Sequence, residues 1–290
     1  MKLQEACIEC ILGQARRVAS KIGASKELTL SIESTALKHS QKFSFSKTPV
    51  QVATPLYEEI ALLAGKKDLY DEAKLIATQQ ALEMLPKLKE MIEKSEDSLL
   101  AAGKMAVAGN VIDLATQAEY DLTAVVDAVL QSEFGRDDFT LLFKDLKSAK
   151  TLLYLADNAG EHIFDALFME KLNAVYPQLE ITYMTRGNAI INDVTLEEAK
   201  ADGLAKFATL KSSGMRTPGF ILEDAPKEVA EFFSKADVVI AKGMGNFESM
   251  TEVSLRDVYH LFKVKCSVVS GFTGFPIGTF MSMKRHCDDE

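Results

Sequence analysis

The chain has 290 residues, of which 47% are apolar, a composition typical of a globular protein with a sizeable core. Its formal net charge of −9, from 42 acidic and 33 basic residues, excludes general electrostatic attraction to nucleic acid or anionic lipid. No apolar stretch is long enough to span a bilayer, and the first ten residues lack a signal-peptide core. We therefore expect a cytoplasmic protein that acts on a small molecule, with neither a membrane nor nucleic acid as partner.

The N-terminal half shows helical periodicity. The segment that ends at Gly23 places Ile8, Ile11 and Ala15 on one face, and four further segments repeat this spacing. Nothing in this half alternates with a period of two residues, as a half-buried strand would. We predict an all-helical bundle domain over residues 1–145.

Short apolar runs alternate with amphipathic helices in residues 146–290. This alternation is typical of parallel βαβ units, which build a sheet with helices on both faces. We predict a Rossmann-like, three-layer αβα domain with a mostly parallel sheet, which makes the whole chain an α/β protein. The candidate strands are residues 151–157, 180–185, 207–212, 237–243 and 265–271.

Polar residues follow the first four of these candidate strands. The carboxyl ends of parallel strands lie at one edge of a sheet, where such folds bind their ligands. We therefore expect the four groups of residues to meet. They are Asp157, Asn158, Gly160 and Glu161; Arg186, Gly187, Asn188, Asn192 and Asp193; Ser212, Ser213 and Gly214; and Lys242, Gly243, Gly245, Asn246 and Glu248.

Asp157, Asn158 and Asp193 have the chemistry of a divalent-metal site. Two carboxylates and an amide oxygen are hard ligands that suit Mg²⁺ or Mn²⁺ better than Zn²⁺. In the alternative interpretation the two aspartates only cap helices. Thr195 is the better cap for the second helix, because Thr195 and Glu198 have the spacing of a capping box. Asp193 is then available to bind metal.

The segment "IAKGMGNFE" has the features of an anion cradle. Lys242 supplies positive charge, while Gly243 and Gly245 allow backbone N–H groups to approach an anion at the start of a helix. The alternative is a simple strand-to-helix turn. Ser213 and Gly214 form either a second anion-binding loop or a surface turn.

Asn110 and Asp113 are three residues apart and share one helical face. They either cap the helix or form a solvated stripe, or they line a cleft between the two domains.

Cys7 and Cys10 form a Cys-x-x-Cys motif in a chain with four cysteines, which favours a reducing compartment over a disulfide scaffold. A thioredoxin-like site is excluded because the motif does not follow a βαβ strand. A zinc site completed by His286 and Cys287 is the alternative, and it requires the chain ends to meet.

The order of the motifs resembles that of the damage-control phosphatase family, in its prokaryotic subfamily with a Cys-x-x-Cys motif. The resemblance extends over nearly the whole chain. One departure is Ala189, near which relatives often have proline. The motifs are "CIEC", "TP" at residues 54–55, "GNVID", "LADNAGE", "RGNAIINDVT", "SSG" and "AKGMGNFE".

The resemblance implies a helical bundle joined to a Rossmann-like domain, with a metal-dependent phosphatase site between them. It assigns the metal to Asp157, Asn158 and Asp193, and it matches a conserved phosphate-contacting lysine to Lys242. Glu161 is expected to support these ligands or to begin a helix.

We therefore expect a phosphatase that uses Mn²⁺, Mg²⁺, Co²⁺ or Ni²⁺ to hydrolyse small phosphometabolites, such as damaged sugar phosphates, nucleotides or coenzyme-related phosphoesters. Either Asp193 or Glu248 is the general base. The alternatives are an S-adenosylmethionine-dependent methyltransferase and a non-enzymatic metal- or nucleotide-binding protein. The expected catalytic residues are Asp157, Asp193, Lys242 and Glu248. The expected substrate-binding residues are Arg186, Ser213, Gly214, Lys242, Gly243, Gly245, Asn246, Asn110 and Asp113.

Overall fold

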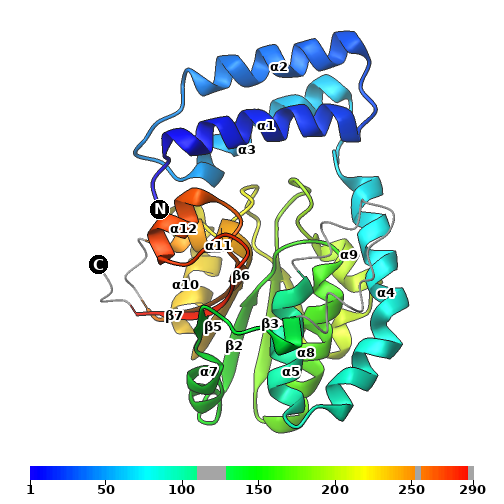
Figure 1. Cartoon of the computed structure of the whole chain (residues 1–290), viewed down its shortest axis with the longest axis vertical. Helices are drawn as coiled ribbons and strands as arrows, with labels where there is room; N and C mark the ends of the chain where they lie inside the picture. Colours follow the sequence, from blue (N-terminus) through cyan, green and yellow to red (C-terminus); the bar gives the residue numbers. More distant parts are fainter. Residues whose placement is uncertain (110–128, 252–255, 287–290) are drawn as a thin grey trace.

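A seven-stranded sheet forms the centre of the molecule in the computed structural model, which describes residues 1–109, 129–251 and 256–286 (Figure 1). The strand order is β1-β7-β6-β5-β2-β3-β4, and only the β6–β7 pairing is antiparallel. The predicted α/β class with a mostly parallel sheet is confirmed. The strands are β1 (Arg136–Asp137), β2 (Thr151–Leu155), β3 (Glu180–Thr185), β4 (Thr209–Ser212), β5 (Val238–Lys242), β6 (Val258–Lys263) and β7 (Phe280–Arg285).

Three helices form a lobe at the top of the molecule in Figure 1: α1 (Glu5–Lys21), α2 (Lys26–Ser40) and α3 (Pro49–Ala64). They bury a common apolar cluster that includes Val18, Ile32 and Leu56, each at most 1% exposed. The side chain and backbone of Thr48 pair with those of Gln51 in a capping box that begins α3. We call these three helices the helical lobe.

Helices cover both faces of the sheet, as the side-chain alternation of β2 shows. One group of helices covers each face. Leu152 and Tyr154 point to one face and pack with the first group, whereas Leu153 and Leu155 point to the other face and pack with the second; both groups are given below. This confirms the predicted three layers. The first group is α4 (Asp71–Lys94), α5 (Ser98–Ala108), α7 (Phe139–Leu146) and α8 (Glu161–Val175). The second is α10 (Lys227–Lys235) and α11 (Gly243–Met250).

Helices α4, α5 and α7 precede residue 146 and nevertheless contribute to the core of the sheet. Met105 of α5 and Leu142 of α7 are fully buried in one cluster with Phe164 and Phe168 of α8. Among the described helices before residue 146, only α1 to α3 pack into a cluster of their own. The domain boundary at residue 145 stays a prediction, but the part before it is not all-helical, because β1 pairs with β7.

One predicted strand is wrong. Residues 265–271 include most of α12 (Ser267–Thr273), in which the Cys266 side chain accepts a hydrogen bond from the backbone of Val269 and so caps the helix. The strand in this part of the chain is β6, which begins at Val258, seven residues before the predicted strand, and it pairs with β5. The two consecutive valines favoured a strand, but the Cys266 side chain caps the backbone here and a short helix forms.

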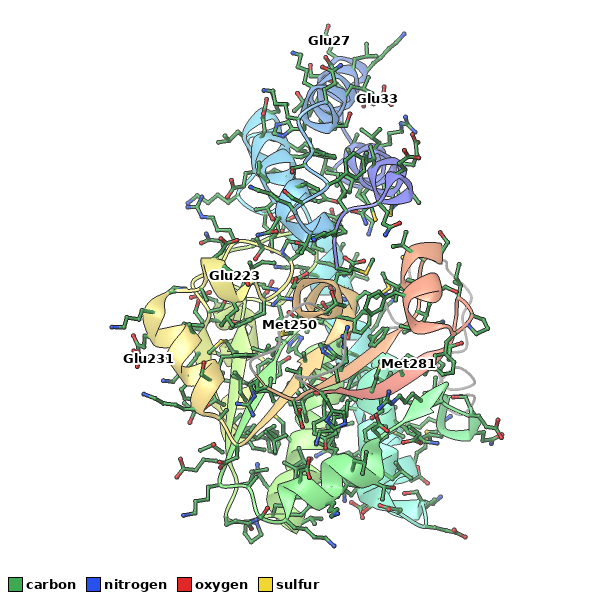
Figure 2. All side chains as sticks on the ribbon, turned by 90° about the vertical axis from the view of Figure 1, so that its left-hand side faces the viewer. Glu27, Glu33, Glu223, Glu231, Met250 and Met281 are labelled. Carbon is green, nitrogen blue, oxygen red and sulfur yellow. The ribbon has the colours of Figure 1, made fainter. Side chains whose placement is uncertain are left out.

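The remaining short helices are α9 (Leu196–Ala201), η2 (Leu204–Lys206) and η3 (Leu222–Asp224). Figure 2 shows Glu27 and Glu231 at the outer surface, whereas Met250 and Met281 lie inside the fold, at 3% and 0% exposure. Within the described residues, no helix combines the length and the apolar character needed to cross a membrane.

Candidate metal and phosphate site

The three predicted metal ligands lie together where β2 and β3 end. Asp157 and Asn158 follow β2, and Asp193 lies in the loop after β3. An isolated antiparallel bridge pairs Asn158 with Asp193, and the backbone N–H of Val194 donates to the carbonyl of Asp157 at 2.9 Å. All three side chains are buried, with exposures of 8%, 6% and 1% in chain order.

Asp193 has one satisfied and one unsatisfied carboxylate oxygen. Its Oδ2 accepts a hydrogen bond from Nε of Arg186, whose exposure is 2%. The other oxygen, Oδ1, is buried with no hydrogen-bond partner, and so is Nη2 of Arg186. An unpartnered buried carboxylate oxygen is costly unless a ligand completes it. A cation beside Asp157 and Asn158 would do so.

The charge of the cluster also favours a cation. Burial raises the pKa of Asp157, and the negative charge of Asp193 raises it further. Burial likewise raises the pKa of Asp193, against the lowering effect of Arg186. Buried carboxyl groups this close together attract a divalent ion, which would restore their ionised forms.

The donor set fits Mg²⁺ or Mn²⁺. Two carboxylates and one amide oxygen are hard ligands, and they leave coordination positions for water and phosphate oxygens. Among the residues that the structure describes, no group of three or more His, Cys, Asp or Glu side chains is placed to hold a metal, so a metal at this site would depend on the amide oxygen of Asn158 as its third ligand.

Thr195 and Glu198 form the predicted capping box at the start of α9, in which their side chains and backbones pair reciprocally. Lys74 of α4 also pairs with Glu198, at 2.8 Å, and donates to the backbone carbonyl of Asp193 at 3.4 Å. Asp193 is therefore held in place by its neighbours and does not itself cap the helix.

Lys242 lies beneath the site instead of on its surface. Its side chain is fully buried, and its Nζ donates to Asp165 at 2.6 Å and to Glu161 at 3.4 Å. The predicted contact between Lys242 and phosphate stays a prediction. The sequence reasoning missed Asp165, because an acidic residue inside an amphipathic helix gives no motif.

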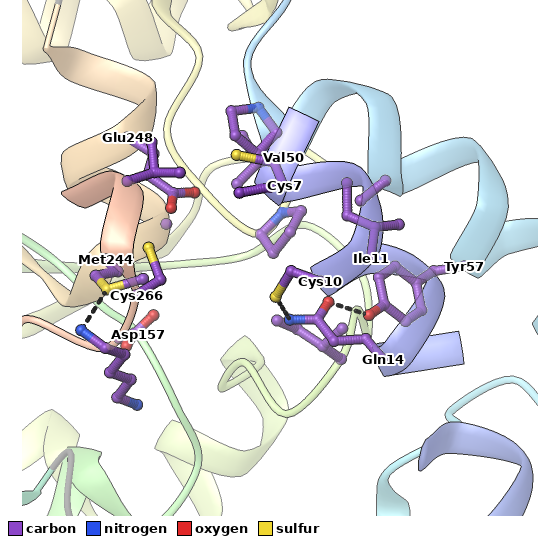
Figure 3. Close-up of a pocket in the computed structure, with 18 of the residues that line it drawn as sticks. Cys7, Cys10, Ile11, Gln14, Val50, Tyr57, Asp157, Met244, Glu248 and Cys266 are labelled. Carbon is purple, nitrogen blue, oxygen red and sulfur yellow. Dashed lines mark hydrogen bonds between the residues drawn. The ribbon is translucent and has the colours of Figure 1, made fainter. Parts of the chain in front are cut away.

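A cavity of about 300 Å³ separates the helical lobe from this edge of the sheet (Figure 3). The figure shows Glu248, Cys10 and Cys266 around it, with Asp157 at its base. Its walls therefore combine two of the three proposed metal ligands, Asp157 and Asn158, with residues of both parts of the molecule. The lining includes Cys7, Cys10, Gln14, Val50, Ala53 and Tyr57 from the lobe, and Asp157, Asn158, Asn192, Gly245, Glu248, Lys265 and Cys266 from the rest.

Lys265 is a cavity residue that the sequence analysis missed. It is exposed, it lines the cavity with Asp157, and its charge acts to lower the pKa of Asp157 and of Glu161 against the larger effect of burial. It follows β6, so it lies at the same edge of the sheet as the other strand ends. The wrong strand at 265–271 had placed this lysine at the opposite, amino end of a strand.

Gly243 brings the start of α11 against Asp157. Its φ is +78°, and a Cβ there would lie 1.9 Å from Oδ2 of Asp157. Gly245 lines the cavity, and its Cβ would lie 2.0 Å from the carbonyl oxygen of Pro218. These close approaches explain both glycines of the predicted cradle.

Both ends of the Asn246 amide form hydrogen bonds that connect loops at this edge of the sheet. Its Nδ2 donates to the carbonyls of Ala156 and Lys242 at 3.0 and 2.7 Å, and its Oδ1 accepts from Arg186 and from the backbone of Phe220. It thus joins the ends of β2 and β5 to the loop before η3.

Ser213 and Gly214 lie behind the site, against the loop after β3. Ser213 is 1% exposed and accepts a hydrogen bond from Met215, while a Cβ on Gly187 would lie 2.3 Å from the backbone of Gly214. Neither residue is among those that line the cavity. Asn110 and Asp113 lie outside the described residues.

Comparison with known proteins gives a consistent result over the whole chain. Residues 3–279 match the family model described as "Damage-control phosphatase ARMT1-like domain". The chain belongs to the damage-control phosphatase family.

Relatives of full length support this assignment. A damage-control phosphatase of Pyrococcus horikoshii is 31% identical over 286 residues, covering 98% of both chains, and one of Archaeoglobus fulgidus is 30% identical, covering 97% of this chain and 99% of its own. The crystal structure of a DUF89 family protein of Pyrococcus horikoshii superposes with a TM-score of 0.89 at 31% identity, over 98% of this chain and 99% of that one. The family assignment confirms the predicted resemblance to this family and the enzyme class, a phosphatase. Membership of the subfamily with a Cys-x-x-Cys motif stays a prediction.

Cys7 and Cys10 lie on the lobe side of the cavity. Cys7 is buried and Cys10 is exposed, and both line the cavity together with Cys266. The alternative zinc site required Cys287 and His286. Cys287 lies outside the described residues, and Nδ1 of His286 lies 3.3 Å from the carboxylate of Asp257.

Proposed function

We propose that this chain is a divalent-metal-dependent phosphatase that hydrolyses small phosphorylated metabolites in the cavity between the helical lobe and the sheet. The observation that carries the proposal is the buried set of Asp157, Asn158 and Asp193, with an unpartnered oxygen on Asp193. Lys265 on the same cavity wall supplies positive charge for a phosphate. These features favour a phosphatase over the methyltransferase and over the non-enzymatic binding protein.

Asp157, Asn158 and Asp193 would hold Mg²⁺, Mn²⁺, Co²⁺ or Ni²⁺. When bound, such an ion draws charge from the phosphoryl group and positions a water molecule. Arg186 keeps Asp193 oriented through the hydrogen bond from Nε to Oδ2. In this proposal Lys265 is the residue that contacts the phosphate directly. Arg186 and Lys242, which were expected to do so, are both buried.

The phosphate would bind between Lys265 and the start of α11. The helix begins at Gly243, so its first backbone N–H groups and its positive end lie at the cavity. Charge that develops on the equatorial phosphoryl oxygens would be neutralised by these groups in the loose transition state.

Glu248 is the better candidate for the general base. It lines the cavity, and burial raises its pKa to about 7, which suits proton transfer near neutral pH. Asp193, in contrast, is committed to Arg186 and to the metal. Glu248 would accept the proton of the attacking water.

The size of the cavity supports a small substrate. About 300 Å³ is at the lower end of the range for small-molecule sites. Gln14 and Tyr57, joined by a 2.6 Å hydrogen bond, present polar atoms on the lobe side, where the leaving group would lie. A cytoplasmic location stays a prediction from the sequence.

The test is phosphate release from an aryl phosphate by protein treated with a chelator and then supplied with each of the four metals. We expect activity only after metal is restored, and a loss of more than about 100-fold in Asp157→Ala and Asp193→Ala. Lys265→Ala should raise KM, whereas Lys235→Ala, on the outer surface of α10, should change nothing. Equal activity in the wild type and both aspartate variants would refute the proposal.

A further inference from the structure

A chain of buried polar contacts leads from the interior of the sheet to Asn158. It begins at Asp165 of α8, whose carboxylate accepts hydrogen bonds from the hydroxyls of Tyr154 and Tyr183 at 2.6 and 2.9 Å. Lys242 donates to the same carboxylate at 2.6 Å. All four side chains are 0% exposed, so their positions are set by the core.

Glu161 connects this buried group to the proposed metal ligands. Its Oε2 accepts from Nζ of Lys242 at 3.4 Å, and its Oε1 accepts from Nδ2 of Asn158 at 2.7 Å. The same amide nitrogen donates to Oδ2 of Asp157 at 2.9 Å. Glu161 is 2% exposed, and its backbone begins α8.

These contacts decide which way the amide of Asn158 faces. An amide nitrogen has two hydrogens to donate, and ionised carboxylates only accept. The carboxylates of Asp157 and Glu161 therefore take both hydrogens, and the nitrogen cannot exchange places with the oxygen without two repulsive oxygen–oxygen contacts. Oδ1 of Asn158 is left to face a ligand.

A purely structural role would not need ionic groups at these positions. A buried ion pair is often no more stabilising than apolar side chains of the same volume, so its presence calls for another reason. The contact chain ends at Asn158 and Asp157, which are two of the three proposed metal ligands. The buried charges are therefore placed to orient these two ligands.

We propose that Glu161, held by Lys242 and Asp165, is a positioning residue that keeps the carbonyl oxygen of Asn158 directed at the metal. The proposal rests on the proposed function, since it assigns Asn158 to the metal. Lys242 then acts on the site through Glu161.

Glu161→Gln tests the proposal with almost no change of volume. A glutamine cannot accept from Lys242 and from Asn158 with both of its terminal atoms, because one of them is now a donor. We expect the dissociation constant for Mn²⁺, measured by calorimetric titration of the metal-free protein, to rise about 10- to 100-fold.

The double variant Asn158→Asp/Glu161→Gln provides the rescue. Asn158→Asp alone places a third carboxylate against Asp157 and Glu161 and should weaken Mn²⁺ binding. In the double variant the new amide at position 161 can donate to the new carboxylate, so only the contact with Asp157 stays repulsive. We expect the double variant to bind Mn²⁺ at least tenfold more tightly than Asn158→Asp.

Tyr183→Phe and Tyr259→Phe are matched controls for loss of a buried hydroxyl. Tyr183 donates to Asp165, whereas Tyr259 donates to Asp145 at 2.6 Å, away from the cavity. Each should lower the melting temperature by a similar amount, because each loses one hydrogen bond to a carboxylate. Only Tyr183→Phe should also weaken Mn²⁺ binding.

The outcomes separate this inference from the proposed function. If Asn158→Ala weakens Mn²⁺ binding and Glu161→Gln does not, Glu161 is not a positioning residue and the metal site stands. If neither variant weakens binding, both proposals are wrong. Weakening by Glu161→Gln without recovery in the double variant also overturns the inference, because loss of structure rather than orientation would then explain the effect.

Discussion

Glu248 shows how one half-buried side chain links the site to pH. Burial raises its pKa to about 7, and the positive charge of the N-terminal amine acts in the opposite direction. The carboxyl group therefore changes charge near neutral pH while it lines the cavity. A general base with this pKa is ionised only above about pH 7.

We expect kcat/KM at saturating metal to rise with pH through about 7 in the wild type, and this rise to be absent in Glu248→Gln.

The free energy of unfolding should show the opposite trend with pH. Between the ordinary value of 4.5 and about 7, the folded protein keeps a proton that the unfolded chain has lost, so the free energy of unfolding falls as pH rises.

Urea unfolding at several pH values measures that fall, which Glu248→Gln should reduce but not abolish, because the raised pKa values of Asp157 and Asp193 contribute in the same direction. A pH–rate profile that is identical in the wild type and the variant would show that another group is the base.

The junction of β5 and α11 shows how an element positions the site. The strand ends at Lys242, and Gly243 at once begins the helix with a positive φ. The turn is tight enough to bring the backbone against the carboxylate of Asp157, at the end of the neighbouring strand β2. A side chain at position 243 would therefore displace Asp157, a proposed metal ligand.

Gly243→Ala should weaken Mn²⁺ binding by about 100-fold or more and lower the free energy of unfolding by about 1–3 kcal/mol, because the new methyl group strains the backbone and displaces Asp157. Gly271→Ala in α12 is the control, since nothing lies within 4 Å of a Cβ there. Calorimetric titration and thermal melting measure the two effects. Equal behaviour of the two variants would contradict this account of the junction.

Elements were predicted well where the local pattern was strong. β2, β3, β4 and β5 lie within the expected segments, and the capping box at Thr195 is present. β1, β6 and β7 were missed, and α12 was taken for a strand. Short apolar runs have no periodicity that separates strand from helix. The error mattered for function, because it hid Lys265 at the end of β6.

At the scale of the molecule, the cavity depends on the helical lobe and the sheet together. Asp157 at the edge of the sheet and Tyr57 of α3 line the same space, although they are 100 positions apart. The lobe is therefore expected to select the leaving group, while the edge of the sheet holds the metal and the phosphate.

Ala53→Phe places a ring into the cavity from α3, where Ala53 is 5% exposed. We expect KM for a bulky phosphate monoester to rise about tenfold or more, with Mn²⁺ affinity unchanged. Leu62→Phe on the same helix, at a position 81% exposed, should leave both unchanged. An unaltered KM in Ala53→Phe would mean that the leaving group does not bind against α3.

The sequence by itself determined the α/β class and the grouping of Asp157, Asn158 and Asp193, since strand periodicity and the hard-ligand chemistry of strand ends are local properties. Only the tertiary structure decided that Lys242 points to Asp165 and that Lys265 lines the cavity. The direction of a lysine at a strand end depends on which helix packs over it. That packing is set by contacts between segments far apart in the chain, which no local pattern records.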